Sequence, residues 1–141
     1  MADEKRLLIP VDRSENSLRA LSHVIKRAVG DKQLRLYVLN VQPALPSSLF
    51  VTRAMIASHH EAKSKEALIR ARRLLSKSRL RAEVAVRIGE PADMIVKLAR
   101  RNRCAEIVMG SRGLGSFKGL LLGSITTKVI HAARVPIAVV P

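Results

Sequence analysis

The chain lacks most of the residues that build aromatic or disulfide-stabilised cores. Among its 141 residues there is no tryptophan, one tyrosine, two phenylalanines and a single cysteine, Cys104. One cysteine excludes an intramolecular disulfide and fits a reducing compartment. Because 48% of the residues are nevertheless hydrophobic, the core must consist of leucine, isoleucine, valine and alanine. Such a core is typical of layered α/β proteins, whose buried parallel strands are continuous aliphatic runs.

Long apolar segments are missing too. No part of the chain has the apolar length needed to cross a bilayer, and the residues after Met1 lack the apolar stretch of a secretory signal peptide. We therefore expect a soluble, cytoplasmic protein with no membrane partner. The length suits one domain over residues 1–141, and we find no internal repeat or linker.

Acidic residues are scarce, which leaves a net charge of +15. Such a surplus attracts phosphate-bearing partners, among them nucleotides, nucleic acid and acidic membrane surfaces, without choosing between them. Arg70, Arg73 and Lys77 share one line of a predicted helix and could follow a phosphate backbone. No helix-turn-helix motif or aromatic platform accompanies them, so nucleic-acid binding is the less favoured interpretation.

Aliphatic runs alternate with segments of helical periodicity along the chain. Their order predicts five strands and four helices, and hence a single-domain, doubly wound, parallel five-stranded α/β sheet with helices on both faces. Right-handed crossovers favour the strand order 3-2-1-4-5. The predicted strands are 5–11, 34–41, 83–88, 105–109 and 136–140, and the predicted helices begin after Ser14, near Arg53, at Pro91 and at Ile125.

This strand order places two chemically distinctive segments together. The first and fourth strands become neighbours, and ligands of such sheets bind at the carboxyl ends of the strands, where the strand order reverses. Asp12 follows the first strand, whereas Gly110 and Gly113 follow the fourth, and Gly123-Ser124 precedes the last helix. Gly110 and Gly113 are expected to allow positive φ and close backbone approach, and the helix N-terminus adds partial positive charge. The pattern predicts an anion site and, with a base-binding crevice, a nucleotide site.

The glycine spacing resembles a family signature. Gly110 and Gly113 are separated by two residues, and nine more precede Gly123-Ser124, as in universal stress proteins of the ATP-binding type. The stretch 7–12, Gly89-Glu90-Pro91 and the terminal stretch 135–140 resemble further landmarks of the family, so the similarity covers essentially the whole chain. The resemblance implies an ATP-binding, nucleotide-responsive regulator of stress adaptation. It leaves open whether Mg²⁺ accompanies ATP, and whether AMP or a cyclic nucleotide is preferred.

The resemblance also implies roles for individual residues. Pro10, Val11, Asp12 and the Val41 backbone would meet adenosine, whereas Met109, Gly110, Arg112 and Gly113 would line the ribose and phosphates. Gly123, Ser124, Ile125 and Thr126 would hold the phosphates through N–H groups and through the Ser124 and Thr126 hydroxyls. Two structural alternatives stay open. Asp12 could only stabilise the turn into the first helix, and Ser124 could only cap the last helix.

No catalytic or metal-binding residue is predicted. The loop supplies a phosphate cradle without an obvious base, so we do not expect an efficient enzyme, although slow ATP hydrolysis stays open. We expect His59 and His60 on the surface and Cys104 buried and inert. The alternative functions are a slow nucleotide hydrolase, and a basic scaffold that binds nucleic acid or protein without nucleotide. An apolar edge strand at 136–140 predicts a homodimer through this C-terminal strand, Pro136 to Val140, as the family resemblance also implies.

Overall fold

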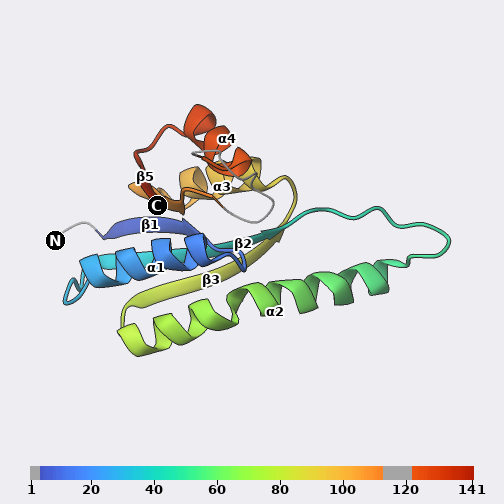
Figure 1. Cartoon of the computed structure of the whole chain (residues 1–141), viewed down its shortest axis with the longest axis horizontal. Helices are drawn as coiled ribbons and strands as arrows, with labels where there is room; N and C mark the ends of the chain where they lie inside the picture. Colours follow the sequence, from blue (N-terminus) through green and yellow to red (C-terminus); the bar gives the residue numbers. More distant parts are fainter. Residues whose placement is uncertain (1–3, 113–121) are drawn as a thin grey trace.

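A computed structural model describes residues 4–112 and 122–141 of the chain (Figure 1). Its elements are β1 Lys5–Pro10, α1 Glu15–Arg27, β2 Leu34–Gln42, α2 Arg53–Ser78, β3 Arg81–Ile88, α3 Pro91–Arg101, β4 Glu106–Gly110, α4 Ser124–Ala132 and β5 Ile137–Val140. The strands pair in parallel in the order β3-β2-β1-β4-β5. The predicted α/β fold class and strand order are therefore confirmed.

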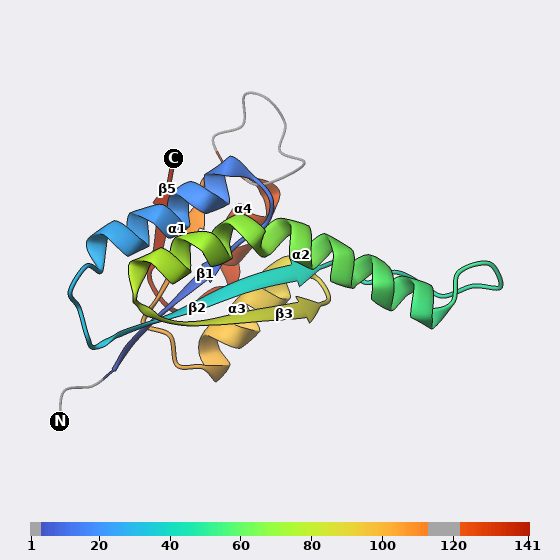
Figure 2. The ribbon, with the colours of Figure 1, turned by 90° about the horizontal axis from the view of Figure 1, so that it is seen from below.

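Two helices cover each face of the sheet, and each face has its own aliphatic core. Figure 2 shows α1 and α2 together on one side, with α3 on the other. Between α1, α2 and the sheet lies a cluster that includes Leu21, Leu36 and Leu68. Between α3, α4 and the sheet lies a second cluster that includes Ile95 and Ile107. The sheet is thus buried on both faces, which explains why its strands are aliphatic runs instead of alternating patterns.

Local signals in the sequence set the starts of the helices. Ser14 Oγ accepts the Ser17 N–H at 3.2 Å and caps α1, as predicted. Pro91 is the first residue of α3, also as predicted, and the Glu90 carboxylate before it accepts the Asp93 N–H at 2.7 Å. This bond from the Asp93 backbone holds the pKa of Glu90 below its ordinary value. Both helices therefore begin at a group that satisfies their first N–H donors.

Helix α2 is far longer than the sheet it covers. Its 26 residues span about 39 Å at 1.5 Å per residue, and its N-terminal half projects past the sheet together with the connection 43–52 (Figures 1 and 2). Within this connection Leu49 and Phe50 are 96% and 88% exposed. The buried residues of α2 are His60, Ser64, Ala67, Leu68, Ala71 and Leu75. The C-terminal half therefore holds most of the packing that fixes the helix to the sheet.

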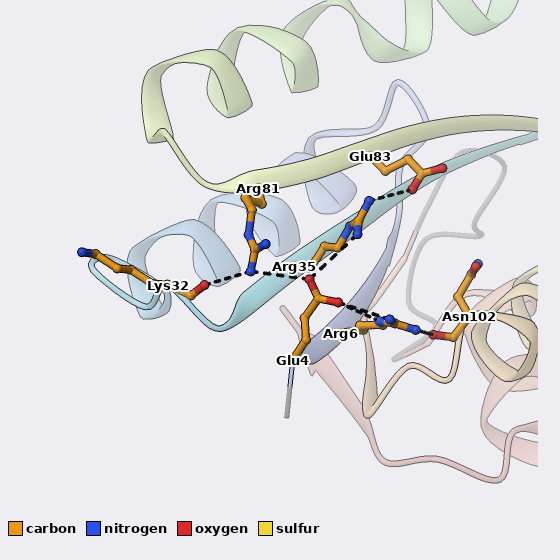
Figure 3. Close-up of polar contacts among 7 residues, drawn as sticks. All are labelled: Glu4, Arg6, Lys32, Arg35, Arg81, Glu83 and Asn102. Atoms are coloured by element: carbon orange, nitrogen blue, oxygen red, sulfur yellow. Dashed lines mark hydrogen bonds and ion pairs between the residues drawn. The ribbon is translucent and has the colours of Figure 1, made fainter. Parts of the chain in front are cut away.

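The amino ends of β1, β2 and β3 carry a cluster of ion pairs around one carboxylate (Figure 3). The Glu4 carboxylate lies 3.2 Å from the Arg6 guanidinium, 3.5 Å from that of Arg81 and 3.9 Å from that of Arg35. Arg35 also lies 3.5 Å from the Glu83 carboxylate. Adjacent parallel strands bring these side chains to one edge, so three of the cations in this basic chain share a counter-ion.

Among the residues that the structure describes, no helix is both long and apolar enough to cross a membrane.

Candidate functional site

A cavity of about 430 Å³ lies at the carboxyl ends of β1, β2 and β4, beside the N-terminus of α4. Its volume falls in the range of small-molecule sites in proteins. Of the twelve predicted site residues, Gly113 lies outside the described part of the chain, and the other eleven all line this cavity. They are Pro10, Val11, Asp12, Val41, Met109, Gly110, Arg112, Gly123, Ser124, Ile125 and Thr126. The order of the strands therefore brings residues that are distant in the sequence to one cavity.

The cavity exists because β1 and β2 end at different heights. Pro10 is opposite Leu39, yet β2 continues to Gln42. The Leu39 carbonyl accepts the Val11 N–H at 2.8 Å, so the Leu39 backbone faces β1. Because backbone direction alternates along a strand, the N–H and carbonyl of Val41 face the same side, where β1 has already ended. Val41 thus presents one donor and one acceptor to the cavity, as its predicted role requires.

Asp12 closes the β1 side of the cavity and also orders the turn into α1. Its Oδ1 accepts the Ser14 N–H at 2.8 Å. The buried Ser17 hydroxyl lies 3.0 Å from the Asp12 carbonyl oxygen and 3.2 Å from its nitrogen. Asp12 therefore stabilises the turn into α1 and also lines the cavity. The turn holds the carboxylate in place at the cavity wall.

Gly110 lines the cavity, as predicted, but its backbone conformation differs from the one expected. It is the last residue of β4, opposite Val140 of β5, and it is absent from the glycines with positive φ, which are Gly30 and Gly89 in the described chain. A Cβ at Gly110 would lie 2.7 Å from both the backbone carbon and the oxygen of Asn16 in α1. The prediction of positive φ is wrong for this residue. Gly110 is needed because α1 approaches β4 too closely for any side chain.

The N-terminus of α4 also lines the cavity. Two of its predicted phosphate donors form hydrogen bonds within the chain instead. The Gly123 N–H donates to the Ser111 carbonyl at 2.7 Å, and the Thr126 hydroxyl donates to the Gly110 carbonyl at 3.1 Å. Both donors are therefore engaged within the chain, in place of the phosphate contacts that the sequence predicted for this N–H and this hydroxyl. They hold α4 against the end of β4.

The first turn of α4 still carries backbone donors. Gly123 is the N-cap, and as a glycine it has no side chain with which to cap the helix. The N–H groups of Ser124, Ile125 and Thr126 belong to the first turn and have no partner inside the helix. Arg112, which is exposed, adds a formal positive charge at this end. The arrangement can bind an anion through several N–H groups and the partial charge of the helix.

Several lining residues were missed by the sequence analysis. Asn40, only 1% exposed, donates from Nδ2 to the Val11 carbonyl at 2.8 Å and accepts from Gln42 Nε2 at 2.8 Å. A buried amide inside an aliphatic strand is a signal that could have been noticed. The further lining residues are Arg13, Leu39, Pro43, Lys63, Glu66, Ala67, Pro91 and Ile95. Those on α2 had no signal, because only the packing of α2 brings them to the cavity.

The remaining candidates behave as follows. His60 is buried, contrary to prediction, with Nε2 2.9 Å from the Pro43 carbonyl oxygen. Burial raises the pKa of the Cys104 thiol to about 11, in agreement with an inert cysteine. Arg70 pairs with Glu15 of α1, which removes one cation from the predicted basic row on α2. No cluster of metal-ligand residues occurs within residues 4–112 and 122–141.

In doubly wound α/β domains, a cavity at the topological switch point beside a helix N-terminus is the usual place of a nucleotide site. The chain belongs to the universal stress protein family, which matches residues 4–141. It is 29% identical over 138 residues to the universal stress protein MJ0531 of Methanocaldococcus jannaschii, covering 96% of this chain and 81% of that one. It is 30% identical over 139 residues to a Thermus aquaticus universal stress protein, covering 96% and 98%.

Solved structures share the fold. The protein MJ0577 of M. jannaschii superposes with a TM-score of 0.81 at 28% identity, covering 99% of this chain and 96% of that one. Family members at 19–25% identity have the same architecture; one from Archaeoglobus fulgidus, solved in complex with dAMP, has a TM-score of 0.70 at 23% identity with full coverage of both chains. Two further members were solved with cAMP and, from Arabidopsis thaliana, with AMP.

Proposed function

We propose that this universal stress protein binds an adenine nucleotide, with ATP as its ligand, and acts as a nucleotide-responsive regulator of stress adaptation. One observation carries the proposal. At the cavity, the side of β2 at Val41 that β1 does not cover and the first turn of α4, whose N-cap is Gly123, line one space. The first offers a donor and an acceptor to a base, and the second offers N–H groups to phosphates.

The dimensions and chemistry of the cavity fit such a ligand. Asp12 at the β1 wall supplies a carboxylate, which accepts hydrogen bonds from ribose hydroxyls. Met109 and Ile95 supply apolar surface for a flat base. The dAMP, cAMP and AMP complexes of family members support an adenine nucleotide as the ligand class. The choice of ATP rests on the signature spacing of Gly110, Gly113 and Gly123-Ser124.

We propose a binding protein and not an efficient enzyme. Hydrolysis of ATP needs a water held in line with the terminal phosphate and a residue that orients it. At the α4 end the described lining residues are Gly110, Arg112 and Gly123 to Thr126, none of which is a general base. The alternative is a slow nucleotide hydrolase. A cytoplasmic location, expected from the sequence, belongs to the same proposal.

The proposal is tested by identifying the nucleotide that the purified protein carries. Native mass spectrometry of the freshly isolated protein should show a bound adenine nucleotide. At a ligand concentration ~100-fold above the dissociation constant, binding adds about 2.7 kcal/mol of stability. That corresponds to a rise in melting temperature of roughly 5–11 °C for a chain of this size. The absence of both carried ligand and thermal shift with ATP, ADP, AMP and cAMP would contradict the proposal.

Asp12→Asn sharpens this test. The amide oxygen can still accept the Ser14 N–H, so the turn should be retained, while affinity falls about tenfold through loss of the charged acceptor. Asp31→Asn is the matched control, because Asp31 accepts the Gln33 N–H at 2.9 Å in a similar turn remote from the cavity. Equal affinities in the two variants would remove Asp12 from the site.

We further propose a homodimer that pairs β5 with β5 across a two-fold axis. Strand β5 is the edge of the sheet, and its four residues are half-buried. The Pro136 and Val140 carbonyls accept from Ile107 and Ser111, so these residues face β4 and the Val139 backbone faces outward. Val139→Pro removes that outward N–H and should convert a dimer into a monomer. Sedimentation equilibrium measures the change; a monomeric wild type, or a dimeric variant, contradicts it.

A further inference from the structure

Two walls of the cavity differ in charge. At the α4 wall the first-turn N–H groups and Arg112 are all positive. Along the wall formed by the end of β1 and by α2, the lining residues Asp12, Arg13, Lys63 and Glu66 carry two negative and two positive charges, which sum to zero. A chain with a net charge of +15 therefore has a locally neutral wall here, and the acidic residues produce it.

Glu66 is the residue that balances the cations of this wall. Its Oε1 lies 3.4 Å from Arg13 Nη1, and its Oε2 lies 3.7 Å from Lys63 Nζ, so each carboxylate oxygen faces one cation. Asp12 and Glu66 both line the cavity, so the Glu66 carboxylate faces the same space as the residue to which the proposed function assigns the ribose. Without Glu66, Arg13 and Lys63 would face the cavity with Asp12 as the one acidic residue left among these four lining residues.

We propose that Glu66 determines the ligand specificity of the cavity, by disfavouring nucleotides that carry a separate phosphate monoester on the 2′ or 3′ oxygen. The inference rests on the proposed function, since it assigns a role at the ribose end of an adenine nucleotide. A 2′- or 3′-phosphate would lie beside a carboxylate whose neighbouring cations are already engaged. It would lose its hydration without gaining a free counter-ion.

The size of the effect follows from Coulomb's law. The Glu66 side chain is 52% exposed, so the repulsion is screened by solvent. At a separation of about 6 Å and an effective dielectric constant of about 40, one unit of opposed charge corresponds to about a tenfold change in affinity. Neutralising Glu66 also releases Arg13 and Lys63 toward the ligand, which acts in the same direction.

The test compares AMP with adenosine 3′,5′-bisphosphate by isothermal titration calorimetry. The wild type should bind AMP more tightly than the bisphosphate. In Glu66→Gln the ratio of the two affinities should fall about tenfold, mainly through tighter binding of the bisphosphate. Glu66→Asp keeps the charge and should keep the wild-type preference. Glu61→Gln removes a charge from α2 at a residue that does not line the cavity, and should leave the ratio unchanged.

The possible outcomes distinguish a failure of the assignment to Glu66 from a failure of the proposed nucleotide binding. An unchanged ratio in Glu66→Gln, including equal weakening of both ligands or a mere loss of stability, overturns the assignment to Glu66. AMP binding would then still support the proposed function. A wild type that shows no preference between the two nucleotides also overturns the assignment. A wild type that binds neither overturns the inference and the proposed function together.

Discussion

The two ends of the sheet use the same kinds of residue in opposite ways. At the amino end, Glu4 lies within 3.2–3.9 Å of three arginines, and its charge is balanced inside the chain (Figure 3). At the carboxyl end, the polar groups of β1, β2, β4 and α4 surround a cavity of about 430 Å³. One end is a set of ion pairs between side chains, and the other arranges donors and acceptors around a cavity.

Strand length explains this difference. The amino ends of β1, β2 and β3 are level, since Lys5 is opposite Leu34 and Arg35 is opposite Arg81. At the carboxyl end β1 stops while β2 and β3 continue to Gln42 and Ile88. Level ends let side chains of adjacent strands meet and pair, whereas staggered ends leave backbone groups without a neighbouring strand. A ligand site therefore forms at the staggered end.

The largest expected effect comes from Gly110→Ala, which adds a side chain at the carboxyl end of the sheet. The new Cβ would lie 2.7 Å from the Asn16 backbone, so α1 must move away from β4. We expect a loss of about 3 kcal/mol in the free energy of unfolding and a fall in melting temperature of roughly 10 °C, together with weaker nucleotide binding. Chemical denaturation and calorimetry measure both.

Gly30→Ala serves as the control for this glycine. Its φ is +80°, with nothing within 4 Å of the added Cβ, so only backbone strain is introduced. It should cost about 1 kcal/mol and leave nucleotide affinity unchanged. If Gly110→Ala proves as mild as Gly30→Ala, the close approach of α1 does not limit the site.

A smaller effect is expected from Glu4→Gln, which removes the charge of the shared carboxylate at the amino end of the sheet. Three partly exposed arginines lose their shared counter-ion, which should cost about 1 kcal/mol of stability, and less at high salt. Nucleotide affinity should not change, because the two ends of the sheet are separate. Thermal unfolding at low and high salt, with titration of AMP, provides the measurement.

Glu83→Gln is the matched variant for the amino end. Glu83 forms one ion pair, with Arg35 at 3.5 Å, and its removal should cost less than that of Glu4. Equal losses for the two variants would show that the cluster around Glu4 is not cooperative. A change in nucleotide affinity in either variant would break the proposed independence of the two ends.

The sequence predicted the outline of the fold because its signals are local. Aliphatic runs marked every strand, and Ser14 and Pro91 marked helix starts. Boundaries shifted by a residue or two, and the one with consequences is β4, which includes Gly110. Whether a glycine ends a strand or begins a loop depends on its pairing with β5, and no local pattern contains that information.

The predicted site residues also came together, but their individual roles were less predictable. Thr126 was expected to donate to phosphate, and its hydroxyl instead donates to the Gly110 carbonyl. His60 was expected on the surface, and the Pro43 segment covers it. In both cases a side chain is engaged by a segment more than 15 residues away in the sequence. Hydrogen-bond partners at such separations depend on how elements pack.

By itself the sequence determined the alternation of strands and helices, the order of the sheet and the landmarks of the family, since these follow from periodicity, chain connectivity and glycine spacing. Only the tertiary structure decided which donors face the cavity and which are already bonded. It alone brought Lys63 and Glu66 of α2 to the wall beside Asp12. The physical reason is that a free donor or a balanced charge is a property of the surroundings, which the chain creates only once its helices have packed against the sheet.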